Sequence, residues 1–78
     1  MNLKIKAIKA NVTELHLPNG AVVMFSYNTP VAAQRAEGGF IRTDEHYSKT
    51  TTKHINQWLD GRKAEIVPQA DINALAGV

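Results

Sequence analysis

The hydrophobic residues at the start of this 78-residue chain follow a period of two. Apolar residues alternate with Lys4 and Lys6 over residues 3–7, and the alternation slips by one position near Ile8. A period of two predicts a β-strand, and the slip predicts a β-bulge near its end. The lysines are expected to line a solvated face of this strand.

Residues 12–17 form a second alternating run, in which Glu14 and His16 take the polar side. Pro18-Asn19-Gly20 follows, and Asn-Gly between two such runs predicts a tight hairpin turn. The returning run, residues 21–27, is apolar on both faces over most of its length. It is therefore expected to form a central strand that is covered on both sides.

Two shorter runs, residues 31–34 and residues 39–43, flank a turn that contains Gly38, and they predict a second hairpin. Pro30 is expected to interrupt the pairing before this hairpin, because proline has no amide hydrogen to donate. Residues 62–67 are compatible with a short strand or with an extended link, and the pattern leaves both open.

Residues 50–60 are the segment with helical periodicity. Ile55, Trp58 and Leu59 recur on one side of a helical wheel, while lysine and amide side chains take the other side. This amphipathic pattern predicts the main helix of the protein, packed through its apolar side against the strands.

The ends of this helix, and a second, shorter helix, are marked by capping residues. Thr50 or Thr51 is expected to accept a hydrogen bond from a free amide of the first turn, and Gly61 suits the left-handed residue that closes the helix. Pro68 then suits the first position of a C-terminal helix over residues 68–76.

These elements predict one small domain of the α+β class over residues 1–78. It consists of an antiparallel meander of four to five strands. The main helix, at about residues 50–60, and the short C-terminal helix, at about residues 68–76, pack on this meander.

Composition narrows the classes of function. The absence of cysteine rules out a disulfide framework and a thiolate metal site. Nine lysines and arginines against seven aspartates and glutamates give a net charge of +2, well short of the dense basic stripe of a dedicated nucleic-acid binder. No segment approaches the ~18 consecutive apolar residues of a membrane span. We therefore expect a cytoplasmic protein with no membrane partner.

The densest group of polar side chains, residues 44–54, lacks the spacing of a catalytic or metal site. His46 and His54 are eight positions apart, whereas two metal ligands on a helix are three or four apart. Ser48 is not part of a nucleophile elbow. We expect no metal, no cofactor and no enzymatic activity, and we interpret these residues as a polar loop that leads into a capped helix.

Three other side chains have plain structural interpretations. Trp58 is expected in the core, and Tyr27 is expected to pack at the end of a buried strand with its hydroxyl at the rim. His54 is expected to have a hydrogen-bonded structural role.

Six basic residues remain as candidate contacts to a protein partner or to a nucleic acid. They are Arg35, Arg42, Lys49, Lys53, Arg62 and Lys63. The sequence has neither the paired aromatic residues that stack on bases nor a recognition helix after a tight turn. This favours scattered surface charge over a dedicated nucleic-acid site.

Two segments resemble a group of short, uncharacterised phage and prophage proteins. These are SYNTPVAA at residues 26–33 and YSKTTTKHINQWL at residues 47–59. The resemblance implies a small accessory protein made in the cytoplasm of an infected bacterium, and it implies no activity or site residue.

Two function classes follow. The first is a module that binds a host or phage protein, for instance an inhibitor of a bacterial defence system such as CRISPR interference. The second is a weak, sequence-nonspecific nucleic-acid binder. A homodimer that completes its sheet across a two-fold axis is compatible with either.

Overall fold

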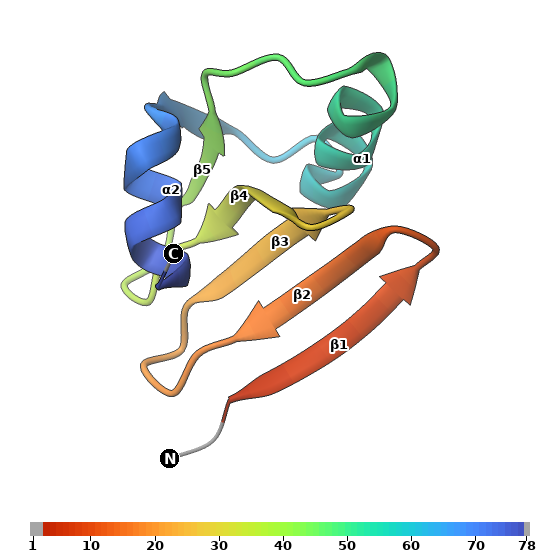
Figure 1. Ribbon diagram of the computed structural model, residues 1–78. Coiled ribbons are helices and arrows are strands. Elements are labelled where there is room, and N and C mark those ends of the chain that lie inside the picture. The colour runs from red at the N-terminus through yellow and green to blue at the C-terminus, as the bar shows by residue number, and fades with distance from the viewer. Residues whose placement is uncertain (1–2, 78) are drawn as a thin grey trace.

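The computed structural model describes residues 3–77, which form a single six-stranded sheet with one helix on each side (Figure 1). In chain order the elements are β1 (Lys4–Lys9), β2 (Val12–His16), β3 (Val22–Ser26), β4 (Thr29–Gln34), β5 (Phe40–Thr43), α1 (Lys49–Leu59), β6 (Ala64–Val67) and α2 (Gln69–Ala76). None of the helices in this part of the chain is long and apolar enough to cross a membrane.

The strands lie in the sheet in the same order as in the sequence, so β1 and β6 are its two edges. The first five strands form an antiparallel meander, which confirms the α+β class and the two expected hairpins. The sheet has one strand more than expected, because residues 64–67 pair with β5. This pairing is parallel, since α1 carries the chain back to the end of the sheet at which β5 began.

The two helices cover opposite faces of the sheet and create two separate cores. On the α1 side, Ile55 and Leu59 pack against Met24 of β3 and Val12 of β2. On the α2 side, Ile72 is fully buried in a cluster with residues of β3, β4, β5 and β6. The central strand β3 therefore contributes to both cores, as its two apolar faces predict.

Local irregularities fall partly where the sequence places them. The register of β1 against β2 shifts between Ala7 and Lys9, which confirms the predicted bulge. Pro30, however, does not interrupt the pairing. It lies inside β4 opposite Phe25, and the register shift beside it accommodates the missing amide donor.

The main helix occupies residues 49–59, close to the expected span, but its cap differs from the prediction. Ser48 is the N-cap and accepts a hydrogen bond of 3.0 Å from the amide of Thr51. The expectation that Thr50 or Thr51 caps the helix is therefore wrong. At the other end, Asp60 and Gly61 both take left-handed conformations.

Candidate binding surface

Edge strand β1 is exposed at all six of its residues, although half of them are apolar. The side chain of Ile5 is 77% exposed, and Leu3, just before the strand, is 58% exposed. Among residues 3–77 no strand pairs with the outer edge of β1. A strand with free backbone groups and an exposed apolar face is the usual starting point for pairing with another chain.

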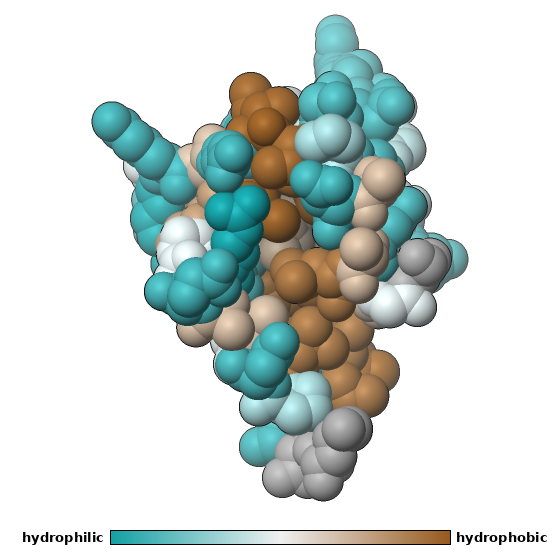
Figure 2. All heavy atoms as spheres, turned by 90° about the vertical axis from the view of Figure 1, so that its left-hand side faces the viewer, coloured by the Kyte–Doolittle hydropathy of each residue, from teal (hydrophilic) through white to brown (hydrophobic). Residues whose placement is uncertain are grey.

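The apolar face of β1 continues into an open groove of about 250 Å³. The groove is lined by residues from β1, β2, β3 and the turn after β3: Ile5, Thr13, Leu15, Phe25, Tyr27 and Asn28. Leu15 lies directly opposite Ile5 in the β1–β2 ladder, so the two side chains share a face of the sheet. Figure 2, which views the molecule from the side of α2, shows hydrophobic residues gathered in a band with hydrophilic residues to either side.

The groove stays open because α2 is short and packs on the middle strands of the sheet, away from β1. This helix contacts β3, β4 and β5, so its apolar side chains leave the outer part of the same face uncovered. Leu15 and Phe25 mark the boundary, since both are half-buried and pack at the margin of the α2 core.

Tyr27 borders the groove, and its ring lies 5.9 Å from the ring of His54, but its side chain is more exposed than expected. Its side chain is 50% exposed, and it lies in the tight turn after β3 with a φ of 57°. The left-handed conformation ends the alternation of β3 at Tyr27. The strand pattern, when continued to this residue, therefore predicts too little exposure for its side chain.

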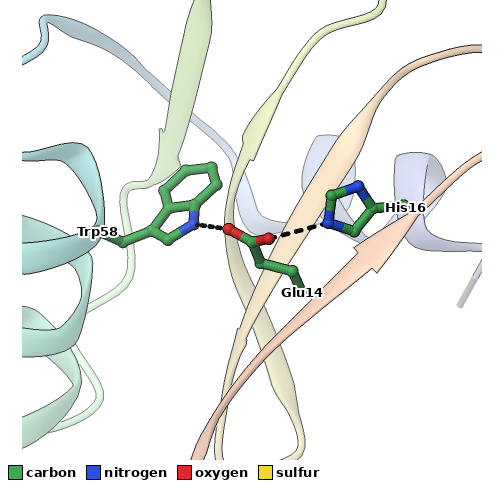
Figure 3. Close-up of polar contacts among 3 residues, drawn as sticks. All are labelled: Glu14, His16 and Trp58. Atoms are coloured by element: carbon green, nitrogen blue, oxygen red, sulfur yellow. Dashed lines mark hydrogen bonds and ion pairs between the residues drawn. The ribbon is translucent and has the colours of Figure 1, made fainter. Parts of the chain in front are cut away.

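The opposite face of the β1–β2 hairpin is polar and is attached to α1 through Glu14 (Figure 3). The indole Nε1 of Trp58 donates a hydrogen bond of 2.7 Å to one carboxylate oxygen of Glu14, and His16 Nε2 lies 2.9 Å from the other. Burial alone would raise the pKa of Glu14. The hydrogen bonds from Trp58 and His16, with the charges of His16 and Lys6, outweigh burial and lower this pKa below its ordinary value.

A row of three lysines follows the α1 side of β1. Lys4 lies opposite His16 and Lys6 opposite Glu14, and the bulge brings Lys9 opposite Val12, so all three share the face of Glu14. Lys9 donates a hydrogen bond to the side-chain oxygen of Gln57 in α1. Within residues 3–77, neither Lys4 nor Lys6 forms an ion pair. We call Lys4, Lys6 and Lys9 the lysine row.

Two of the six basic residues singled out in the sequence, Arg35 and Arg62, form ion pairs or several contacts within the fold. Arg35, in the turn after β4, forms an ion pair of 3.2 Å with Glu65 of β6. Arg62 donates to the backbone oxygens of Trp58 and Leu59 at the end of α1. Its guanidinium also lies 4.5 Å from the centre of the Phe40 ring.

The other basic candidates lie on or beside α1. Arg42 of β5 donates a hydrogen bond of 3.1 Å to Asn56, and Lys49, Lys53 and Asn56 are spaced so that they share one side of the helix. Lys63 is exposed in the link after α1. The structure thus brings Arg42, Lys49 and Lys53 together and leaves the remaining candidates elsewhere.

A buried network of hydroxyls and imidazole lies beneath α1. Ser26 Oγ is 2.8 Å from Nδ1 of His54 and 3.0 Å from the hydroxyl of Thr51. Burial, followed by the charges of Lys9 and Lys53, lowers the pKa of His54 and favours a neutral ring. All three residues are buried. They line neither the groove nor a second open hollow, which is formed by Lys4, Ile5, Lys6 and His16. This is the hydrogen-bonded structural role expected for His54.

The polar segment 44–54 is divided between a loop and the start of α1. Ser48 caps the helix, and Thr52 lies 3.4 Å from Nδ1 of His46. Among the described residues no three histidine, aspartate or glutamate side chains are placed to hold a metal ion.

Residues 2–74 match a protein family described as a family of unknown function, DUF8033. The chain belongs to this family. No curated protein and no solved structure matches the chain.

The site of this DUF8033 protein therefore rests on its own geometry, and the sequence missed most of it. The apolar groove residues follow the same alternation as core residues, so nothing in the sequence marks them as uncovered. The informative signal was the length of the second helix: eight residues span about 12 Å and cannot cover six strands about 4.8 Å apart.

Proposed function

We propose that this protein acts by binding a protein partner through β1 and the adjoining groove. The observation that carries the proposal is the coincidence of an unpaired strand edge with an exposed apolar face, at Ile5, on the same element. A strand edge supplies backbone hydrogen bonds to a partner, and an apolar groove supplies the desolvated centre of an interface.

The chemical make-up of the surface suits this mode of action, because an interface has an apolar centre and a polar rim. The groove provides an apolar centre, and the lysine row on the other side of β1 provides a polar rim. The sequence resemblance adds the context of a phage or prophage accessory protein, in which the partner is a host or phage protein, for instance a component of a bacterial defence system.

The second candidate function, weak nucleic-acid binding, is supported by one observation. Lys49 and Lys53 share one side of α1, and Arg42 of β5 contacts Asn56 on that side. The first turn of the helix also has amides that lack a partner within the helix. Against it, three cations form a small patch, and Asp44 and Glu45 lie in the loop that precedes the helix. We therefore place this candidate second.

A crosslinking experiment tests the proposed function. A photo-crosslinking side chain at Ile5 is expected to capture one defined polypeptide in cells, while the same group at Glu37, exposed in the turn before β5, captures none. The captured polypeptide is then purified, and its affinity is measured against the wild type and variants. Ile5→Ser is expected to weaken binding about tenfold or more, because burial of such a side chain contributes about 1.5–3 kcal/mol.

The matched control is Ile66→Ser on the other edge of the sheet, where the side chain is 67% exposed. It is expected to leave the affinity unchanged. Equal losses in both variants would contradict the assignment of the binding surface to β1. Binding of RNA or DNA that falls by a decade or more between 50 and 200 mM salt, while no polypeptide is captured, would favour the nucleic-acid candidate.

A further inference from the structure

The chemistry of β1 narrows the kind of partner, and this step rests on the proposed function. We propose that β1 is completed by an extended segment of the partner in which acidic and apolar residues alternate. This segment pairs with the outer edge of β1, so that its acidic side chains meet the lysine row and its apolar side chains extend the groove.

The two faces of β1 set this requirement separately. Side chains directly opposite one another on adjacent strands lie about 5 Å apart and interact on the same face of the sheet. On one face a new strand would meet Lys4 and Lys6, and on the other it would meet Ile5. A segment with a period of two satisfies both faces at once, and a shift by one residue would place apolar groups against the lysines.

The charge of the lysine row is available to a partner. Glu14, the acidic residue nearest to it along β2, already accepts hydrogen bonds from Trp58 and His16 through its two oxygens. Lys4 and Lys6 line an open hollow beside His16, and they form no ion pair within residues 3–77. A carboxylate on a neighbouring strand would meet Lys4, which no acidic residue faces across the β1–β2 ladder, and Lys6, whose charge Glu14 balances only in part.

A second copy of the chain is a poorer occupant of this edge. Two β1 strands paired about a two-fold axis place equivalent faces side by side. If the axis passes through Ile5, Lys4 lies opposite Lys6 of the other copy, and if it passes through Lys6, that residue meets its own equivalent. Like charges directly opposite one another are destabilising. The lysine row thus disfavours self-pairing and selects for acidic residues.

The test uses three nine-residue peptides and the full-length protein. The first alternates glutamate and valine, the second alternates lysine and valine, and the third has the composition of the first with its glutamates in one block. The first is expected to bind at least about tenfold more tightly than the other two and to slow hydrogen exchange at alternate amides of β1. Its advantage over the lysine peptide should shrink as salt rises from about 50 to 500 mM.

Charge-reversal variants distinguish pairing with β1 from electrostatic attraction to the protein as a whole. Lys4→Glu/Lys6→Glu is expected to reverse the preference, so that the lysine–valine peptide binds best. The control Lys49→Glu/Lys63→Glu makes the same change in net charge on and just after α1, and it should keep the wild-type preference. Both variants alter exposed side chains, so both are expected to fold, and circular dichroism is used to check this.

The proposal is overturned if the three peptides bind equally, if both double variants shift the preference alike, or if β1 exchange is unchanged. It is also overturned if single-stranded DNA or vesicles of anionic lipid, and not the peptide, protect the β1 amides. These outcomes leave the proposed function standing if the polypeptide captured at Ile5 still binds and Ile5→Ser still weakens it.

Discussion

Glu14 links the β1–β2 hairpin to α1. Its carboxylate is half-buried between the strands and α1, where it accepts hydrogen bonds from Trp58 and from His16. Hydrogen bonds to a charged group contribute about 1.5–3 kcal/mol, so this contact holds an otherwise exposed hairpin against the helix. Lys6 lies opposite Glu14 in the β1–β2 ladder, and its charge contributes to the lowered pKa of this carboxyl.

His54 makes the stability of the protein depend on pH. Its pKa in the folded protein lies below the ordinary value of 6.5 because of burial and because of the charges of Lys9 and Lys53. As the pH falls below about 6.5, the unfolded chain takes up a proton at this ring that the folded protein resists. The free energy of unfolding is therefore expected to decrease between about pH 7 and pH 5.5.

Denaturant titrations across this range measure the effect. His54→Asn retains an acceptor for Ser26 and removes the titrating group, so its unfolding free energy should depend less on pH than that of the wild type. His46→Asn removes an exposed histidine from the loop before α1 and serves as the control. Equal slopes in the wild type and in His54→Asn would contradict the assignment.

At the scale of elements, the start of α1 depends on Ser48. Its hydroxyl accepts a hydrogen bond from the amide of Thr51, and its backbone is fully extended, as an N-cap requires. Ser48→Ala is expected to lower the free energy of unfolding by about 1 kcal/mol, and Ser48→Gly by only a few tenths. Thermal and denaturant unfolding measure both changes.

Thr50 provides the control for this prediction, because it is exposed in the first turn and makes no capping bond. Thr50→Ala should change the stability by less than about 0.5 kcal/mol. A larger effect of Thr50→Ala than of Ser48→Ala would restore the capping residue that the sequence suggested.

The elements that could be predicted from the sequence are those with a strong periodic pattern or turn signal. The Asn19-Gly20 turn, the bulge in β1 and the helix around Ile55 all lie where the pattern indicates. Pro30 and residues 64–67 could not be placed, because their outcome depends on the neighbouring strand. A bulge accommodates the proline, and an available edge on β5 turns an ambiguous link into a strand.

The groove could not be predicted for a related reason. Burial is decided by which helix lies above a strand, and the alternation around Ile5 and Leu15 is the same whether that face is covered or open. The six basic candidates were chosen by charge alone, and the fold engages Arg35 and Arg62 internally. The sequence did place the lysines on one solvated face, but it could not place them at a free edge of the sheet, because the order of the strands decides which strand is outermost.

At the scale of the whole molecule, the sheet separates two kinds of surface at one edge. The lysine row of β1 lies on the face of the sheet that carries α1, and Ile5 lies on the face that carries α2. β1 itself is the outermost strand, at the edge of the sheet away from α2 (Figure 1). Neither property alone would define a partner. Together they require a segment that matches charge on one face and apolar surface on the other.

This arrangement predicts a specific association between two forms of the protein itself. In Lys4→Glu/Lys6→Glu, β1 becomes a strand in which acidic and apolar residues alternate, so it has the pattern proposed for the partner. When it pairs with wild-type β1 about an axis near Ile5, Lys4 and Lys6 of the wild type each lie opposite an introduced glutamate. A mixture of the two forms is expected to dimerise in about 50 mM salt, where each form alone stays monomeric, and to separate in about 500 mM salt, where such charges are screened.

Sedimentation velocity distinguishes these states. If the wild type alone dimerises as strongly as the mixture, the lysine row does not select against a second copy, and the edge is occupied by self-association.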